Sequence, residues 1–134
     1  MMDFSVFEHI IPYVRMTRKG KYVNERAQAY LANQDLLKIR LKEIMRDRNF
    51  IMLPPATPMS VKLVFYRLQP DMHTSDLDNL QKAVCDSMNK IVYPDDRWID
   101  HFIIDRKLNK VEGVAISVRI DVPDSEYNWD RERR

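Results

Sequence analysis

The chain has 134 residues, 45% of them hydrophobic and 31% charged, and a formal net charge of +2. This length and balance indicate one globular domain with a modest core and exclude a disordered chain. No apolar run is long enough to span a bilayer, and the N-terminus lacks the basic start of a secretory signal. The single cysteine, Cys85, cannot form an internal disulfide. We therefore expect one cytoplasmic domain, residues 1–134, without a membrane partner, ending in a charged, frayed tail at 124–134.

The first part of the chain predicts a strand, a basic loop and a helix. Residues 4–11 are apolar and partly β-branched, which favours a strand, and residues 12–24 are typical of a loop. From Glu25 to about Arg48, apolar residues recur every three or four positions, as the buried stripe of a helix requires. Asn24 is a suitable N-cap for this helix.

The second part predicts a strand, a helix and a hairpin. Residues 59–68 favour a strand, and a helical pattern runs from about residue 77 to 90. Residues 98–108 and 114–122 are expected to pair as a β-hairpin, with Gly113 in the turn because glycine reaches positive φ without a steric cost. The order β, α, β, α, β, β predicts an α+β fold with a mixed sheet of about four strands and two main helices.

Aspartates gather between residues 71 and 105. This window contains eight aspartates, three lysine or arginine residues and no glutamate. Glutamate is the better helix former, so a surface that is merely solvated and acidic normally contains both types. Short aspartate side chains with hard oxygen donors suit a divalent cation such as Mg²⁺ or Mn²⁺. The composition is consistent with a metal site but does not specify one.

Two of these aspartates open the second helix, in the stretch SDLDNLQK. Asp76 falls at the N-cap, Asp78 in the first turn, and Lys82 four residues later on the same helix face. Each acidic residue there would stabilise the helix by about 0.3–1 kcal/mol through the macrodipole, and the Asp–Lys pair by about 0.2–0.5 kcal/mol. Helix stability alone is therefore an alternative explanation for the isolated motif.

A second acidic pair, Asp95 and Asp96, follows in the turn after this helix. If the chain folds back so that the two pairs meet, the carboxylates repel one another unless a cation lies among them. Carboxylates, a metal and a nearby lysine would together suit phosphoryl transfer, because the metal activates water and the lysine stabilises charge on the phosphate. Taken alone, the pair is also typical of an ordinary polar turn.

Together, SDLDNLQKAVCDSMN and IVYPDDRWID resemble the RusA family of Holliday-junction resolvases. The hallmark of that family is D-x-D-N-L-x-K-x-x-x-D, followed after a short gap by D-D-x-x-[IV], and the match lies in residues 76–99. The resemblance implies a small homodimeric α+β nuclease that binds four-way DNA junctions. In that family the paired nicks require Mg²⁺, for which Mn²⁺ is a substitute.

The resemblance also implies roles for single residues. The metal-binding carboxylates would be Asp76, Asp78, Asp96 and the adjacent acid Asp95. The first three of these are also expected to be catalytic, and Lys82 would be the catalytic lysine. Asn79 and Asp86 match further motif positions and are interpreted as helix capping or support of the site.

The loop before the first helix offers candidate DNA contacts. An acidic metal site repels phosphate, so a nuclease needs cations around it. The loop carries two tyrosines, Tyr13 and Tyr22, whose rings could stack on bases beside its cations. Its candidate DNA-binding residues are Arg15, Arg18, Lys19 and Lys21. A plain solvated loop is the alternative, since basic runs of this kind are common.

The sequence thus predicts a Mg²⁺-dependent endonuclease that resolves Holliday junctions in recombination or repair, encoded by a cell or by a phage. One alternative is a non-catalytic junction-binding protein of the same fold. The intact set of motif carboxylates and lysine argues against it, because decay usually removes a catalytic carboxylate early. Another alternative is a metal-stabilised structural module with no DNA partner. A two-fold homodimer would match the near two-fold symmetry of a four-way junction.

Overall fold

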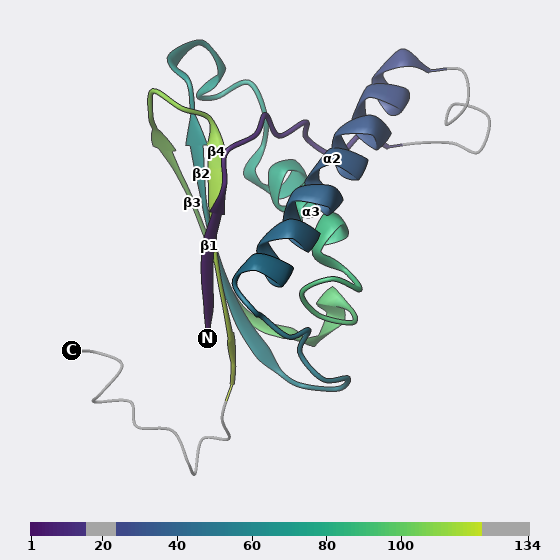
Figure 1. The fold of residues 1–134 in the computed structure, drawn as a ribbon. Helices are drawn as coiled ribbons and strands as arrows, with labels where there is room; N and C mark the ends of the chain where they lie inside the picture. Colours follow the sequence, from purple (N-terminus) through teal and green to yellow (C-terminus); the bar gives the residue numbers. More distant parts are fainter. Residues whose placement is uncertain (16–23, 122–134) are drawn as a thin grey trace.

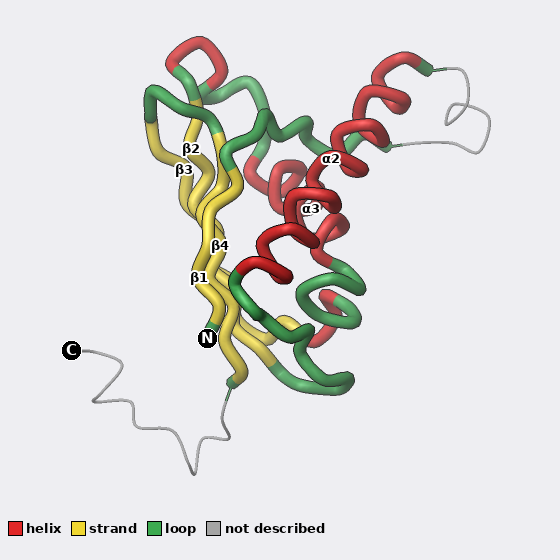
Figure 2. The backbone as a smooth tube through the Cα atoms, viewed as in Figure 1, coloured by secondary structure: helices red, strands yellow, loops and turns green. Residues whose placement is uncertain are grey.

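The computed structural model describes residues 1–15 and 24–121. One four-stranded sheet forms one layer, and two helices cover one of its faces (Figures 1 and 2). The strands are β1 (Met2–Val6), β2 (Met59–Arg67), β3 (Ile99–Leu108) and β4 (Gly113–Ile120), and the long helices are α2 (Glu25–Asp47) and α3 (Leu77–Met88). Short 3-10 turns, η1 (Gln69–Asp71) and η2 (Asp96–Trp98), precede α3 and β3. The predicted α+β fold with a mixed sheet is confirmed.

The predicted hairpin is wrong, although both of its strands exist. The order in the sheet is β1-β4-β2-β3, so β2 lies between β3 and β4 and pairs with both. β3 runs parallel to β2, because α3 carries the chain across the sheet between them. β2 takes the central position with Leu63 and Phe65 completely buried. Its strongly apolar inner face is better covered there than at an edge.

The first strand is shorter than predicted, and Gly113 does not form a turn. β1 ends at Val6, after which the chain leaves the sheet and runs toward the helices. Among the described residues, no glycine has a positive φ. Gly113 instead opens β4, where an added Cβ atom would lie 2.4 Å from the backbone oxygen of Val6. Glycine is required here because β1 approaches β4 closely.

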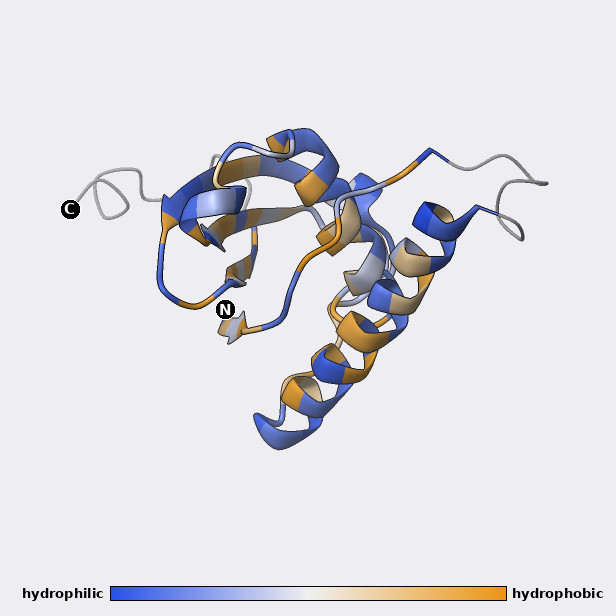
Figure 3. Cartoon of the chain, turned by 90° about the horizontal axis from the view of Figure 1, so that it is seen from above, coloured by the Kyte–Doolittle hydropathy of each residue, from blue (hydrophilic) through white to orange (hydrophobic). Residues whose placement is uncertain are grey.

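α2 begins and packs as predicted. The Oδ1 atom of Asn24 accepts hydrogen bonds from the backbone N–H groups of Arg26, at 2.8 Å, and Ala27, at 3.3 Å. Seen from above, α2 carries both hydrophilic and hydrophobic bands, as a helix with one buried face does (Figure 3). Its buried residues are Ala27, Tyr30, Asn33, Gln34, Leu37, Leu41 and Met45. In the described part of the chain, no helix is long and apolar enough to cross a membrane.

α3 is the helix that carries the motif, and it is buried on most of its circumference. It packs against α2, where the Nε2 atom of Gln34 donates to the backbone oxygen of Ala83 at 2.8 Å. The turn that follows α3 is itself core, because Val92 and Tyr93 are completely buried. The buried residues of α3 are Leu80, Ala83, Val84, Cys85, Ser87 and Met88. This packing leaves one polar face of α3 uncovered.

Candidate active site

The uncovered face of α3 presents a row of charged residues. Asp78, Lys82 and Asp86 are spaced by four residues and therefore share one side of the helix. Asp78 and Lys82 are exposed, and Asp86 is half-buried. The core on the opposite side fixes the helix, so the row has a rigid support.

Asp76 lies at the N-cap, as predicted, but its side chain makes no capping hydrogen bond. An aspartate at this position normally accepts from a backbone N–H of the first turn, and this contact stabilises a helix by about 0.5–2 kcal/mol. Here the carboxylate is exposed and does not make this contact. Capping therefore does not account for an aspartate at this position, and the carboxylate remains accessible to a ligand.

The second acidic pair is held against the C-terminal end of α3. The backbone N–H of Asp96 donates to the Oδ1 atom of Asn89 at 2.9 Å. The Oδ1 atom of Asp95 accepts from the backbone N–H of Arg97 at 3.0 Å and so caps η2. The chain thus folds back on the helix, which is the condition for the acidic pair to approach the row on α3.

Electrostatics link Asp96 to that row. Burial raises the pKa of Asp96, and a hydrogen bond and repulsion from Asp95, together with repulsion from Asp86, raise it further, whereas Lys82 lowers it. The pKa of Asp95 is lowered, chiefly because its carboxylate accepts from the backbone of Arg97. The raised pKa means that the ionised form of Asp96 is destabilised in the protein, and a nearby cation would relieve this destabilisation.

Lys82 has two close partners, one carboxylate and one aromatic ring. Its Nζ atom lies 3.7 Å from the Oδ2 atom of Asp86 and 4.8 Å from the centre of the Tyr13 ring. Asp86, interpreted from the sequence as support of the site, thus contacts the candidate catalytic lysine directly. Tyr13 was expected to stack on bases, and the structure places its ring against the lysine.

Cys85 does not belong to the reacting groups. Its thiol lies on the buried side of α3, and burial raises the pKa of this thiol to about 12. The thiol is therefore protonated near neutral pH and is a poor nucleophile. Cys85 is a small residue of the core.

The structure groups part of the predicted site. Lys82 and Asp86 form an ion pair, and the charges of both act on Asp96, whereas Asp76 and Asp78 lie at the start of the helix. Within residues 1–15 and 24–121, no three His, Cys, Asp or Glu side chains are arranged to hold a metal ion. The donor chemistry nevertheless fits a hard divalent cation, since the side chains supply only carboxylate oxygens and their charges repel one another. Asp76 and the Asp95–Asp96 turn lie at opposite ends of α3, a helix roughly 18 Å long, so one ion shared by all of them would require these two parts of the chain to approach each other.

Comparison with known families decides how the chain is related to other proteins. The model of a family described as Endodeoxyribonuclease RusA matches residues 12–121. The chain belongs to the RusA family. The RusA match includes both acidic pairs, Lys82 and the whole loop before α2. No curated protein matches the chain significantly.

In this RusA chain, the segment that enters the basic loop is attached to the motif helix. The backbone N–H of Tyr13 donates to the carbonyl oxygen of Asn79 in the first turn of α3 at 3.0 Å. Arg15 is exposed two residues further along. The other candidate DNA-binding residues, Arg18, Lys19 and Lys21, lie outside the described residues, as does the tail 124–134. The loop therefore starts beside the helix that carries the RusA motif.

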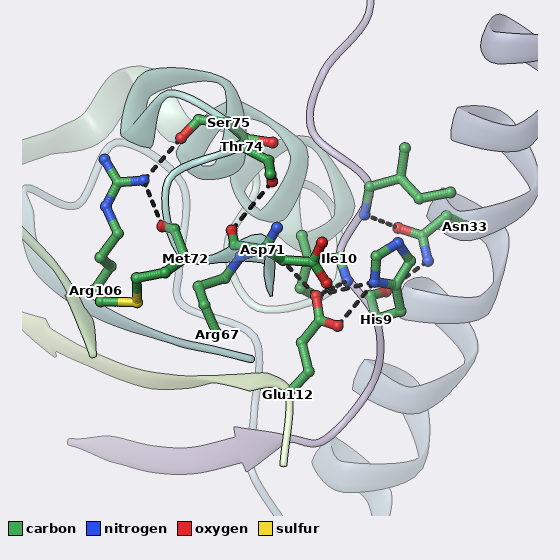
Figure 4. A network of polar contacts seen from close by, with 11 residues as sticks. His9, Ile10, Asn33, Arg67, Asp71, Met72, Thr74, Ser75, Arg106 and Glu112 are labelled. Carbon is green, nitrogen blue, oxygen red and sulfur yellow. Dashed lines mark hydrogen bonds and ion pairs between the residues drawn. The ribbon is translucent and has the colours of Figure 1, made fainter. Parts of the chain in front are cut away.

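Arg106 on β3 is a residue of the RusA fold that the sequence analysis missed. Its Nη1 atom donates to the backbone oxygens of Met72, at 3.1 Å, and Ser75, at 2.8 Å (Figure 4). These two carbonyl groups belong to the loop that leads directly into Asp76. The sequence signal was an arginine in alternation with Phe102 and Ile104 along the predicted strand, and the structure makes it half-buried between exposed neighbours.

Proposed function

We propose that the chain is an endonuclease that recognises four-way DNA junctions and hydrolyses phosphodiester bonds in opposing strands. The proposed cofactor is Mg²⁺, with Mn²⁺ as a substitute, and the proposed role is Holliday-junction resolution in recombination or repair. The observation that supports this most strongly is the close approach of the Asp95–Asp96 turn to the C-terminal end of α3, where the backbone N–H of Asp96 donates to Asn89, in a chain of the RusA family. A plain helix-stabilising motif would not need that approach.

The residues divide the chemistry between them. Asp76, Asp78 and Asp96, with Asp95 adjacent, would hold the metal. When bound, the metal would activate water and stabilise negative charge on the phosphate oxygens. Lys82 places a positive charge where charge develops on the transferring phosphate. This division assigns the carboxylates to the metal and the ammonium group to the DNA backbone.

We infer a homodimer as the working form. A four-way junction is close to two-fold symmetric, and an isologous dimer presents two equivalent sites related by the same symmetry. Paired nicks at symmetric positions require two such sites within one complex. A single 134-residue chain has little surface with which to hold several duplex arms.

The test compares a synthetic four-way junction with a linear duplex of matched sequence, each with Mg²⁺ and with EDTA. We expect symmetric paired nicks in the junction only, lost in EDTA and restored by Mn²⁺. Equal cleavage of the linear duplex would contradict junction selectivity. Tight junction binding without cleavage under any divalent metal would favour the alternative, a binding protein that has kept the fold.

A matched pair of variants tests the assignment of the carboxylates. Asp76→Asn should abolish cleavage and leave junction binding unchanged or tighter, because it removes a charge that repels phosphate. The control is Asp105→Asn, an exposed aspartate on the outer face of β3, which should cleave like the parent. Junction affinity is measured in EDTA and cleavage in Mg²⁺. Retained cleavage by Asp76→Asn would remove this residue from the site.

A further inference from the structure

The ring of Tyr13 lies against the ammonium group of Lys82, with 4.8 Å between the Nζ atom and the ring centre. A cation within about 6 Å of an aromatic face is attracted by the negative charge of that face. Tyr13 comes from the segment after β1, and Lys82 from the middle of α3. The contact therefore joins two parts of the chain that are far apart in sequence.

The Tyr13 ring is itself held in place from two directions. Its backbone N–H donates to the carbonyl oxygen of Asn79 at 3.0 Å, which fixes the residue on the first turn of α3. Its ring meets that of Tyr30 edge to face, with 5.7 Å between centres and 88° between planes. Tyr30 is buried in α2, with 3% of its surface exposed. The ring under the lysine thus rests on the core.

Tyr30 also supports the second partner of Lys82. Its hydroxyl donates to the Oδ2 atom of Asp86 at 3.5 Å, and the same oxygen lies 3.7 Å from the Nζ atom of Lys82. Burial raises the pKa of Tyr30 far above its usual value, so its hydroxyl keeps the proton that it donates. The contacts form a closed cycle of four residues, in the order Lys82, Tyr13, Tyr30 and Asp86.

A catalytic lysine needs contacts that restrain its side chain more than a shorter catalytic group does. Its ammonium group stands on a flexible four-carbon chain, and half of the Lys82 side chain is exposed. An unrestrained side chain would place the charge at the reacting phosphate only part of the time. Two contacts, with the Tyr13 ring and with the Asp86 carboxylate, reduce that freedom.

We propose that Tyr13 is a positioning residue for Lys82, holding the ammonium group over its ring while Asp86 pairs with the same group. The proposal rests on the proposed function, since it assigns Tyr13 to the step that Lys82 assists. It differs from the base-stacking role expected from the sequence. A stacking ring would act on junction affinity, whereas a positioning ring acts on turnover.

The kinetic test uses Tyr13→Leu, which removes the aromatic face, and Tyr13→Phe, which keeps it. Tyr13→Leu should slow single-turnover cleavage of pre-bound junction by on the order of tenfold or more, with the junction dissociation constant in EDTA unchanged. Tyr13→Phe should restore most of the rate, since phenylalanine offers the same face to a cation. If Tyr13→Leu instead weakens binding as much as it slows cleavage, the ring stacks on DNA and the proposal is overturned.

A spectroscopic readout tests the contact without reference to activity. In NMR spectra of the DNA-free protein, the methylene protons of Lys82 next to the ammonium group should be shifted upfield by the ring current of Tyr13. The shift should persist in Tyr13→Phe and disappear in Tyr13→Leu, while the remaining amide spectrum shows that the fold is kept. An unshifted Lys82 in the parent protein would overturn the proposal even if cleavage is observed. Absence of cleavage with the shift present would instead overturn the proposed function.

Discussion

Lys82 is the residue on which the charges of the site converge. It lies 3.7 Å from Asp86 and lowers the pKa of Asp96, so carboxylates on α3 and at η2 both act on its charge. The charge of Lys82 therefore reaches beyond its i,i+4 pair to a residue of the following turn. The position fits a group that acts on a shared ligand rather than on its own helix.

We expect Lys82→Ala to lower turnover by about 10²–10³-fold, because an ordered charge at the developing negative charge is removed. Junction affinity should change little, since many other cations contribute to binding. Single-turnover cleavage and a binding titration in EDTA measure the two effects separately. Exposed Lys62→Ala on the outer face of β2 is the matched control. Equal losses of affinity and of rate would make Lys82 a residue that only grips DNA.

At this scale helical spacing predicted which residues share one helix, but it did not predict the contact of Tyr13 with Lys82. The row Asp78, Lys82 and Asp86 follows from helical spacing alone, and the N-cap position of Asp76 follows from the same pattern. The contact of Tyr13 with Lys82 depends on where the chain runs after β1. No local pattern determines that path, because it is fixed by long-range packing.

Among the elements, β3 both closes one edge of the sheet and fixes the loop before α3. Its residue Arg106 donates to two carbonyl groups of that loop, at Met72 and Ser75 (Figure 4). The loop carries no strand or long helix of its own. The position of Asp76 at the end of this loop therefore depends on the side chain of Arg106, thirty residues later in the sequence.

Arg106→Ala should raise the Mg²⁺ concentration needed for half-maximal cleavage, because the loop before Asp76 loses two hydrogen bonds and its ordered position. Arg106→Lys, which can keep one of the bonds, should show a smaller increase. Mn²⁺ binding measured directly by electron paramagnetic resonance should weaken in the same order. Unchanged metal dependence in Arg106→Ala, with the fold intact by circular dichroism, would contradict the role given to this residue.

The strands themselves were predictable, and their pairing was not. Alternating burial marks each strand locally, and residues 99–108 and 113–120 both form strands close to the predicted ranges. The short connection between these two strands favoured a hairpin. Strand pairing depends on which strand takes the centre of the sheet. β2 takes it because nearly every residue on its inner side is buried. This comparison involves segments about forty residues apart, beyond the reach of local signals.

The whole molecule has two unlike sides. The helices and the motif lie over one face of the sheet, and the other face is left open by the described elements (Figure 2). A hollow of about 300 Å³ on the sheet is lined by polar and apolar residues, among them Ser60, Lys62, His101 and Ile103. None of the predicted catalytic residues lines it. The proposed cleavage chemistry therefore rests on the charged residues of the helical side and not on a cavity.

On the helical side, the acidic pairs come from two parts of the chain, the start of α3 and the turn before β3. An ion held by both would link these parts, and it would bind the folded chain but not the unfolded one. Binding of this kind stabilises the fold by about 2.7 kcal/mol when the free metal is at a hundred times its dissociation constant. Relief of the repulsion that raises the pKa of Asp96 would contribute to that binding.

We therefore expect Mg²⁺ or Mn²⁺ to raise the midpoint of thermal unfolding relative to EDTA at equal ionic strength. The increase should grow with metal concentration and be strongly reduced in Asp76→Asn and in Asp96→Asn, each of which removes a proposed ligand from one of the two parts. Asp105→Asn, on the outer face of β3, should keep the full increase. Differential scanning fluorimetry measures the thermal midpoint, and urea unfolding measures the corresponding increase in the free energy of unfolding. An equal increase in all three variants would show that the metal acts elsewhere on the surface, and the acidic pairs would then be separate features of a helix and a turn.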